Sequence, residues 1–270
     1  MSAVTVLGLG QMGAPIAQVL MGAGHSVTVW NRNEARSAPV VAAGAALAAT
    51  PAEAARGAGV VITMLTDAAA VDAVLFGPDG AAAHLKPGSC VVQMSTIAPA
   101  EVRDVAVRLP AGVDLVDAPV AGSVDAAASG TLRILAGGES GVLDRMTPLL
   151  SVLGTVRRCG AVGDGAAVKL VLNTALVTGL AALADALAVA RSVGVDRDVA
   201  LEALASGPLG AVVARVTTSS SFSIALASKD LDLALRELGD TPAPIAHAAG
   251  HALRAVTDRS ADITALVGKE

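Results

Sequence analysis

Three glycines near the start of the chain have the spacing of a phosphate-binding turn. Gly8, Gly10 and Gly13 form a G-x-G-x-x-G segment that follows an apolar stretch, 4–7, and opens a helical pattern over 14–23. The first glycine permits a tight turn, the second lets the backbone approach a pyrophosphate, and the third lets helix and strand pack closely. Free N–H groups at the start of the helix then bind the phosphates. The segment therefore predicts a dinucleotide site formed by Gly8, Gly10, Gln11, Met12 and Gly13.

The end of the next strand pattern indicates which dinucleotide binds. Residues 26–30 alternate and are rich in β-branched side chains, as in a second parallel strand. NAD-binding units usually place Asp or Glu at this end for the ribose hydroxyls, but here no carboxylate occurs before Glu34. The guanidinium of Arg32 can instead bind a 2′-phosphate by charge-assisted hydrogen bonds. We predict that Asn31 and Arg32 contact NADP(H), in preference to NAD(H); a solvated loop arginine is the alternative.

A lysine and an asparagine share one face of a long apolar helical pattern later in the chain. Lys169 and Asn173 are four residues apart, so their side chains are neighbours on a helix. Burial disfavours the charged form of a lysine, and a lysine whose pKa falls toward neutrality beside a cofactor suits general acid–base catalysis. The pair is a candidate for proton transfer. The alternative is a lysine that lies along the surface beside a structural asparagine.

The elements that must position these residues divide the chain into two parts. In the first part, strand patterns alternate with helical patterns in the rhythm of a parallel sheet. Beyond the first two strands comes the stretch 52–57, and further strand patterns then cover 59–65, 90–94, 113–118 and 132–136. Helical patterns cover 68–75, 99–109 and 140–150. We therefore predict an α/β fold whose N-terminal domain, residues 1–162, is a Rossmann-type doubly wound parallel sheet.

From Gly163 onward the sequence shows no convincing strand. A long helical pattern starts near Asp164, where a capping side chain is favoured, and runs to about Ser192 before it closes at Gly194. Shorter helical patterns follow at 197–205, 209–219, 224–238, 245–257 and 261–267. We predict that residues 163–270 form an all-helical domain for substrate binding or dimerisation, which the long helix joins to the sheet domain.

The composition argues against several classes of function. The 270-residue chain has a formal net charge of −5 and a pI near 5.4, so it lacks the basic character of a nucleic-acid-binding protein. Cys90 and Cys159 match no metal spacing and are expected to be free thiols in a reducing compartment. His247 and His251 are four residues apart but lack the context of a zinc site, so no metal is expected. We expect a cytoplasmic protein without a targeting segment.

The mean hydropathy of +0.64 raises the question of a membrane segment. Residues 170–190 contain one formal charge, at Asp185, and are long enough to cross a bilayer. However, much of the positive hydropathy comes from alanine, and the segment also contains Asn173 and Thr174. A long helix that is buried on most sides in a soluble protein explains the pattern better. We therefore predict no membrane association.

Three further segments resemble those of the β-hydroxyacid dehydrogenase family. Residues 117–123, with 130–132 and 137–138 after them, are similar to the family's substrate-binding segment D-A-P-V-S-G-G followed by G-T-L and G-G. The stretch 163–173 is similar to G-x-G-x-x-x-K-L-x-x-N, and 222–231 to F-x-x-x-L-x-x-K-D-L. With the glycine turn, these matches cover nearly the whole chain. The resemblance implies an NAD(P)-dependent oxidoreductase acting on a small β-hydroxyacid or on the corresponding semialdehyde or keto acid.

The resemblance also implies roles for individual residues. Lys169 donates a proton to the substrate carbonyl oxygen as hydride arrives from the nicotinamide, and in the reverse direction it removes the hydroxyl proton. Asn173 hydrogen-bonds the substrate or orients the lysine. Met64 and Leu65 pack near the nicotinamide and its ribose, although core packing explains both residues nearly as well.

Two more polar residues are expected near the cofactor by the same resemblance. Thr96 contacts the cofactor or the substrate, and Ser95 is an alternative polar contact at this strand end. Lys229 reaches the cofactor from the helical domain, and the alternative is a solvated charge pair with Asp230.

The loop after the strand pattern 113–118 departs from the family pattern. Open α/β sheets bind ligands beyond their strand ends, so the backbone N–H of Gly122 and the side chain of Ser123 are our candidates for holding a substrate carboxylate. Ala121 stands where the family has serine, and Ser123 replaces the second glycine, so the hydroxyl is displaced by two residues. A plain glycine-containing turn is the alternative.

We predict an NADPH-dependent reductase of a small aldehyde or keto acid, with two alternatives. Imine reductases are similar in the glycine turn and in 30–32, but their proton-donor position tends to carry Asp or Tyr where this chain has Lys169. A non-catalytic NADPH-binding module is the second alternative, and loss of that lysine would be its expected mark. The long helix and the apolar helical domain need cover, which together with the resemblance predicts a homodimer or homotetramer.

Overall fold

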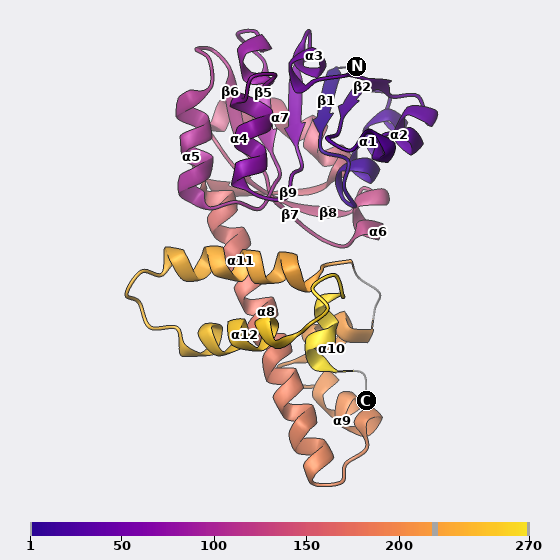
Figure 1. The fold of residues 1–270 in the computed structure, drawn as a ribbon, viewed down its shortest axis with the longest axis vertical. Coiled ribbons are helices and arrows are strands. Elements are labelled where there is room, and N and C mark those ends of the chain that lie inside the picture. Colours follow the sequence, from indigo (N-terminus) through magenta and orange to yellow (C-terminus); the bar gives the residue numbers. More distant parts are fainter. Residues whose placement is uncertain (1, 218–220, 269–270) are drawn as a thin grey trace. The chain divides into compact units, whose positions relative to one another are not determined.

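The structure, a computed structural model, describes residues 2–217 and 221–268 and divides into two compact units (Figure 1). The division lies between Lys169 and Leu170, within the long helix α8, Asp164–Ser192. The first unit contains the strands and the second contains only helices among its described residues. The predicted order of a sheet domain and then a helical domain is confirmed.

A mainly parallel sheet forms the centre of the first unit. Six parallel strands lie in the order β3-β2-β1-β4-β5-β6, which is the order of a dinucleotide-binding Rossmann sheet. Their bounds are β1, Ala3–Leu7; β2, Ser26–Trp30; β3, Ala46–Leu47; β4, Val60–Thr63; β5, Cys90–Gln93; and β6, Asp114–Asp117. The strand order reverses direction between β1 and β4, and such sheets bind ligands in the crevice beyond the carboxyl ends of these two strands.

Three more strands extend the sheet beyond β6. The strands are β7, Val120–Ala121; β8, Leu132–Gly137; and β9, Gly154–Gly160. β8 runs antiparallel to β6 and β7 and parallel to β9. Of these segments, the sequence predicted a strand at β8 but missed the two-residue strand β7.

Helices cover both faces of this sheet, and the strand residues alternate between the two resulting cores. Val60 and Ile62 of β4 face one core with Ile16 and Leu150, whereas Val61 faces the other. The first core lies under α1, Gly13–Gly22; α6, Val124–Ala128; and α7, Ser140–Leu153. The second lies under α3, Pro51–Ala55; α4, Ala68–Phe76; and α5, Pro99–Arg108. Figure 1 shows α4 and α5 in front of the sheet and α7 behind it.

Small elements that the sequence patterns did not predict complete the first unit. They are the short helix α2, Ala38–Ala42, with the 3-10 turns η1, Glu34–Arg36, and η2, Ala82–His84. β3 and α6 were also missed. All of these elements have five residues or fewer, so they carry too few positions to show a period.

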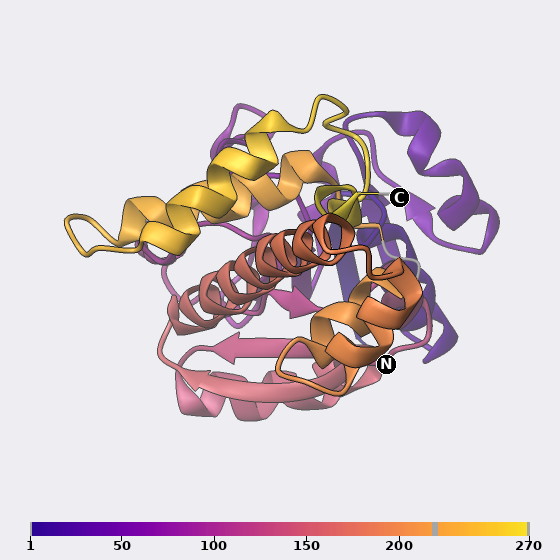
Figure 2. The ribbon, with the colours of Figure 1, turned by 90° about the horizontal axis from the view of Figure 1, so that it is seen from below.

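The second unit is a helical cluster around the C-terminal part of α8. Its other elements are α9, Arg197–Ala205; α10, Gly210–Thr217; α11, Ile224–Glu237; α12, Pro244–Ala255; and the 3-10 helix η3, Ile263–Val267. Leu180 and Leu183 of α8 share a core with Leu231 of α11 and Leu253 of α12. α11 and α12 pack side by side, which Figure 2 shows from below.

The helices of this unit closely follow the sequence prediction. The pattern at 209–219 corresponds to α10, and its last two positions, 218 and 219, lie outside the described residues. The pattern at 261–267 forms a shorter 3-10 helix. The long pattern closes as predicted at Gly194, whose φ of 78° favours glycine.

Among the described residues, α8 is the one helix that is long and apolar enough to cross a membrane. A third of its most apolar window is buried inside the protein. This is less burial than the sequence pattern suggested, since it favoured a helix buried on most sides. Val177, Leu180, Leu183 and Leu187 of α8 contribute to the core of the second unit.

Candidate functional site

The glycine turn joins β1 to α1, and each of its three glycines has a different local requirement. Gly8 has a φ of 104°, and a Cβ there would collide with the carbonyl oxygen of Met64 and lie 2.8 Å from Leu65 Cδ2. A Cβ on Gly13 would collide with the carbonyl oxygen of Gly8. The protein itself therefore requires the first and third glycines.

Gly10 differs because, apart from its own chain neighbours, no heavy atom of the residues that the structure describes would lie within 4 Å of a Cβ built there. The space beside the turn at Gly10 is open, next to the N-terminus of α1. An open approach to backbone N–H groups at a helix start suits a pyrophosphate. The turn therefore fits the phosphates of a dinucleotide, and the exposed side chain of Gln11 and the half-buried Met12 lie between the glycines.

Asn31 ties the end of β2 to this turn. Its Oδ1 accepts a 2.9 Å hydrogen bond from the backbone N–H of Leu9, and its Nδ2 donates to the carbonyl oxygen of Asn33 at 2.7 Å. Arg32, which follows, is exposed. Asn31 thus holds the glycine turn in place, and Arg32 presents a guanidinium at the strand end where a ribose phosphate is expected.

A buried polar network shapes the carboxyl ends of β4 and β5. The Ser95 hydroxyl accepts a 2.9 Å hydrogen bond from the backbone N–H of Leu65. The Gln93 side chain accepts from the N–H of Ser95 at 2.6 Å and donates to its carbonyl oxygen at 2.8 Å. Ser95 and Gln93 are both buried, so this network fixes the path of Met64, Leu65 and the half-buried Thr96.

The sequence patterns did not predict this network. Thr63 also joins it, through a 3.3 Å hydrogen bond from its hydroxyl to Gln93 Oε1. The hydroxyl of Ser95 is used within the protein, because it accepts a hydrogen bond from the N–H of Leu65 and donates one to the carbonyl oxygen of Thr63. The signal available in the sequence was the presence of three polar residues, Thr63, Gln93 and Ser95, at the ends of two strand patterns.

The loop predicted to bind a carboxylate begins after β7. Gly122 has a φ of 150°, and a Cβ there would lie 2.9 Å from Leu132 Cδ2. Ser123 is the N-cap of α6, because its Oγ accepts a 3.2 Å hydrogen bond from the N–H of Ala126. The hydroxyl hydrogen of Ser123 is not used by this cap, so it can still donate to a ligand.

Two of the predicted site residues meet in the helical unit, through a third residue. Asn173 Nδ2 donates a 2.6 Å hydrogen bond to Asp230 Oδ2, and Lys229 Nζ lies 2.8 Å from Asp230 Oδ1. Asn173 and Asp230 are buried, whereas the Lys229 side chain is 26% exposed. The sequence indicates Asp230 only as an alternative partner of Lys229, and its bond to Asn173 is found only in the structure.

Lys169 lies on α8 and is the last residue of the first unit. It is half-buried, four residues before Asn173 on the same helix. The other predicted residues of the first unit lie at the ends of β1, β2, β4, β5 and β7. In this sheet the carboxyl ends of the parallel strands β1, β2, β4 and β5 meet at one edge, so the structure brings Gly8, Arg32, Met64 and Thr96 to that edge.

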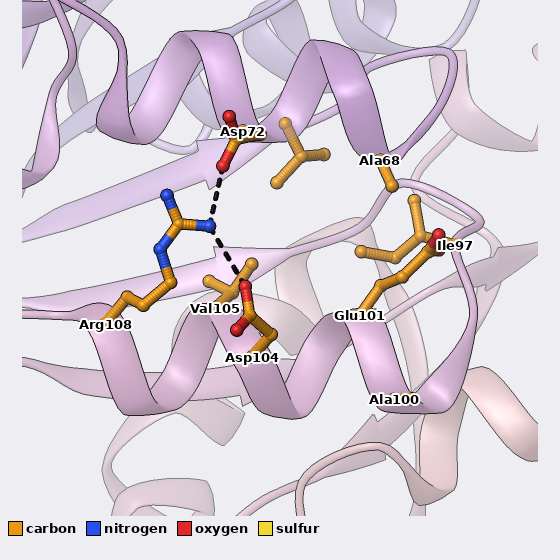
Figure 3. Close-up of a pocket in the computed structure, with 9 residues that line it drawn as sticks. Ala68, Asp72, Ile97, Ala100, Glu101, Asp104, Val105 and Arg108 are labelled. Atoms are coloured by element: carbon orange, nitrogen blue, oxygen red, sulfur yellow. Dashed lines mark hydrogen bonds and ion pairs between the residues drawn. The ribbon is translucent and has the colours of Figure 1, made fainter.

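A cavity of about 340 Å³ between α4 and α5 does not contain any predicted site residue. Figure 3 shows Arg108 at one end of it, where its Nη1 lies 2.6 Å from Asp72 and 3.0 Å from Asp104. The guanidinium also lies 4.0 Å from the centre of the Phe76 ring. The charged end of this cavity is therefore satisfied within the protein, which disfavours it as an anion site.

A second cavity, of about 630 Å³, lies in the helical unit between the end of α8 and η3. It likewise contains no predicted site residue. Over residues 2–217 and 221–268, no group of three or more His, Cys, Asp or Glu side chains is placed to hold a metal ion.

Comparison with known proteins identifies the family. Residues 3–165 match the NAD-binding domain of 6-phosphogluconate dehydrogenase, and residues 163–268 match the NAD-binding domain of NADP-dependent 3-hydroxyisobutyrate dehydrogenase. Curated relatives include 2-(hydroxymethyl)glutarate dehydrogenase of Eubacterium barkeri, 34% identical over 88% of this chain and 84% of the relative. 3-Sulfolactaldehyde reductase of Escherichia coli K12 is 35% identical over 87% of this chain and 83% of the relative.

Solved structures support the same assignment. 3-Hydroxyisobutyrate dehydrogenase of Mycobacterium tuberculosis, solved with L-serine, aligns with a TM-score of 0.87 and 30% identity, covering 99% of this chain and 98% of the other. An imine reductase from Pseudomonas sp. aligns with a TM-score of 0.67 and 26% identity, covering 98% of each chain. The chain therefore belongs to the β-hydroxyacid dehydrogenase family and is an NAD(P)-dependent oxidoreductase.

Proposed function

We propose that the protein reduces a small semialdehyde or keto acid with NADPH, or oxidises the corresponding β-hydroxyacid, with Lys169 as the general acid and base. The observation that carries this proposal is the placement of Lys169 and Asn173 one turn apart on the continuous helix α8. When bound, the nicotinamide cofactor supplies or takes up the hydride. In reduction, the Lys169 ammonium gives a proton to the carbonyl oxygen, and in oxidation the neutral amine takes the hydroxyl proton.

Asn173 has a positioning role in this proposal as well as a direct one. Its Nδ2 is committed to Asp230, so its Oδ1 points along a fixed direction and is the atom available to accept a hydrogen bond. An acceptor held one helical turn from Lys169 can orient the lysine or bind a substrate hydroxyl. Lys229, held by the other oxygen of Asp230, is proposed to reach the cofactor.

The preference for NADP(H) is supported by the end of β2. Residues 31–33 carry no carboxylate, and Arg32 is exposed there. A carboxylate would repel a 2′-phosphate, whereas a guanidinium binds one with paired hydrogen bonds. Asn31 acts mainly by fixing the glycine turn through Leu9.

The substrate is proposed to carry a carboxylate, held by the N–H of Gly122 and the hydroxyl of Ser123. Ser123 keeps its donor hydrogen while its oxygen caps α6. The 3-hydroxyisobutyrate dehydrogenase neighbour was solved with L-serine, a small carboxylate-bearing molecule. With one Trp, two Phe and no Tyr in the chain, aliphatic and small polar groups must line the pocket, which suits a small ligand.

Imine reduction is the second candidate, because imine reductases are also among the structural neighbours. The fold match favours the hydroxyacid enzyme, with TM-scores of 0.87 against 0.67. The presence of Lys169 likewise disfavours a purely NADPH-binding module.

We also propose that the protein is a cytoplasmic homodimer or homotetramer. Val171 and Val189 of α8 are 67% and 61% exposed and lie five turns apart on the same face. A second copy of the chain would cover this face. Light scattering after gel filtration tests the oligomeric state, since a monomer would contradict it, and cell fractionation tests the location.

The central experiment follows NADPH oxidation by the wild type and Lys169→Ala against semialdehydes, keto acids and cyclic imines. We expect turnover of an acidic aldehyde that falls by at least about a hundredfold in the variant, with NADPH affinity unchanged. Lys86→Ala, which removes an exposed lysine of the same unit, is the matched control. Equal rates for Lys169→Ala and the wild type would remove Lys169 from the mechanism, and turnover of imines alone would select the second candidate.

A further inference from the structure

Asp117 is a fully buried carboxylate to which the proposed reaction assigns no task. It is the last residue of β6, with no measurable exposure. Its Oδ2 accepts a 2.8 Å hydrogen bond from the backbone N–H of Ala166, in the first turn of α8. Among the described residues, its Oδ1 has no hydrogen-bond partner. A buried charge in this state is costly and calls for an explanation.

The surroundings of Asp117 bring the start of α8 unusually close to the sheet. A Cβ on Gly165 would collide with the carbonyl oxygen of Leu135 and lie 3.0 Å from Asp117 Oδ2. A Cβ on Gly137 would collide with the carbonyl oxygen of Ala161 and lie 3.1 Å from the nitrogen of Gly165. Two glycines, one on β8 and one on α8, therefore let the helix start reach the carboxylate.

The contact fixes the turn of α8 that carries the proposed acid and base. Ala166 is anchored by Asp117, and Lys169 follows three residues later, about 4.5 Å further along the helix axis. The backbone N–H groups of Gly163 and Gly165 also stabilise the ionised carboxylate. A negative charge at a helix N-terminus is favourable, because it meets unpaired N–H groups and the positive end of the helix dipole.

We propose that Asp117 is a positioning residue. Its ionised carboxylate anchors the N-terminus of α8 and thereby fixes the position of Lys169 relative to the cofactor-binding edge of the sheet. This inference rests on the proposed role of Lys169. The buried charge of Asp117 then lowers the stability of the first unit, but it also places Lys169 within that unit.

The ionisation of Asp117 falls in an accessible pH range. Burial raises its pKa to about 6, against the opposing effect of the three backbone N–H groups. The titratable groups that interact with it are Asp164 of α8, which raises its pKa further, and the thiol of Cys159 on β9. The anchor is therefore charged at neutral pH and becomes neutral as the pH falls below about 6.

The test compares Asp117→Asn and Asp117→Ala, with Asp114→Asn as the control. Asp114 lies on the same strand but pairs with Arg145 at the surface. We expect kcat for carbonyl reduction to fall about threefold or more in Asp117→Asn and about tenfold or more in Asp117→Ala, with the Kd for NADPH within about twofold. Asp117→Asn is expected to melt no lower than the wild type, because it removes a buried charge. A lower kcat in a protein of equal or higher stability separates positioning from folding.

The pH profile provides the second readout. The wild type is expected to lose kcat for reduction as the pH falls through about 6, and Asp117→Asn is expected to lack this limb. An unchanged kcat and an unchanged limb in Asp117→Asn would overturn the proposal. If Asp117→Ala does not fold, Asp117→Asn alone decides between these outcomes.

Hydrogen exchange distinguishes failure of this inference from failure of the proposed function. The amide of Ala166 is expected to exchange faster in both Asp117 variants and at the wild-type rate in Asp114→Asn. If Lys169→Ala keeps full activity, the proposed function fails, and faster exchange at Ala166 would then support only the anchor. Unchanged exchange at Ala166 would refute the anchor itself, whatever Lys169 does.

Discussion

The side-chain amide of Asn173 donates a 2.6 Å hydrogen bond to Asp230, although the two residues lie 57 positions apart in the chain. The other carboxylate oxygen of Asp230 lies 2.8 Å from Lys229 Nζ. One buried acid on α11 therefore determines how a side chain on α8 is oriented and where a lysine on its own helix lies. Two residues that a family resemblance marks separately belong to one polar cluster.

The first prediction concerns the charge balance of this cluster. In Asn173→Asp, a second carboxylate would lie against Asp230 in a buried site, where like charges repel strongly and a donor is lost. We expect the free energy of unfolding to fall by about 3 kcal/mol or more at neutral pH and to recover partly on acidification. Urea unfolding at several pH values measures this change.

The control for this prediction is Ala248→Asp, which adds the same charge to an exposed position of α12, in the same unit but outside the α8 face that a second copy is proposed to cover. Its effect on stability is expected to stay within about 0.5 kcal/mol. Equal effects of the two substitutions would show that Asp230 and Asn173 do not interact as the structure describes.

The second prediction separates the glycines of the turn. In Gly10→Ala the new methyl group contacts no described residue beyond its chain neighbours, but it occupies the space in which a pyrophosphate is expected. We expect unchanged thermal stability and an increase of about tenfold or more in the Kd for NADPH, measured by fluorescence titration. Gly22→Ala, also in open space but at the far end of α1, should leave the Kd unchanged and, as a strain-free glycine replacement in a helix, should not lower the stability. Unweakened NADPH binding by Gly10→Ala would exclude this turn as the phosphate site.

The contrast with Gly13 is the third prediction. A Cβ at Gly13 collides with the carbonyl oxygen of Gly8, which is backbone and cannot move aside as a flexible side chain can. Gly13→Ala is therefore expected to destabilise the first unit by about 2 kcal/mol or more, unlike Gly10→Ala. Differential scanning calorimetry compares the two variants, and equal melting temperatures would contradict the geometry of the turn.

The glycine turn could be predicted from sequence because its requirements are local. Gly8, Gly10 and Gly13 act over six residues, and the strand and helix that flank them have clear periods. The long helix α8 and its end at Gly194 could be predicted for the same reason. Family resemblance then marked the residues that pair across longer distances, such as Asn173, without saying what they contact.

The contacts that orient those residues could not be predicted, because they join distant parts of the chain. Asp117 and Ala166 are 49 positions apart, and Leu65 and Ser95 are 30 apart. A period in the sequence reports which face of an element is buried, but not which polar atoms meet there. The buried acids Asp117 and Asp230 are the residues whose tasks only the structure reveals.

The fourth prediction tests the choice of dinucleotide. Arg32→Ala removes the guanidinium at the end of β2 but leaves Asn31 and the glycine turn intact. We expect the KM for NADPH to rise by about tenfold or more while the KM for NADH changes by less than about twofold. Arg56→Ala, an exposed arginine after α3, is the matched control. A parallel rise for both cofactors would mean that Arg32 does not read the 2′-phosphate.

The last prediction concerns how stability depends on pH. Asp117 has a folded-state pKa of about 6 against an ordinary value of 3.8, so between these values the folded protein holds a proton that the unfolded chain has released. Protonation therefore favours the folded state, and this group's contribution to stability falls as the pH rises from about 4 to about 6. The shift corresponds to about 3 kcal/mol.

Other carboxylates titrate in the same range, so the useful quantity is the difference in the free energy of unfolding between Asp117→Asn and the wild type. The asparagine cannot ionise, and this difference is expected to grow in favour of the variant as the pH rises through 4 to 6 and then to level off. Asp114→Asn removes a carboxylate from the same strand without a buried charge and should show no such rise. A difference that stays constant across this range would mean that the Asp117 carboxylate carries no burial cost, and the reason for assigning it a positioning task would be lost.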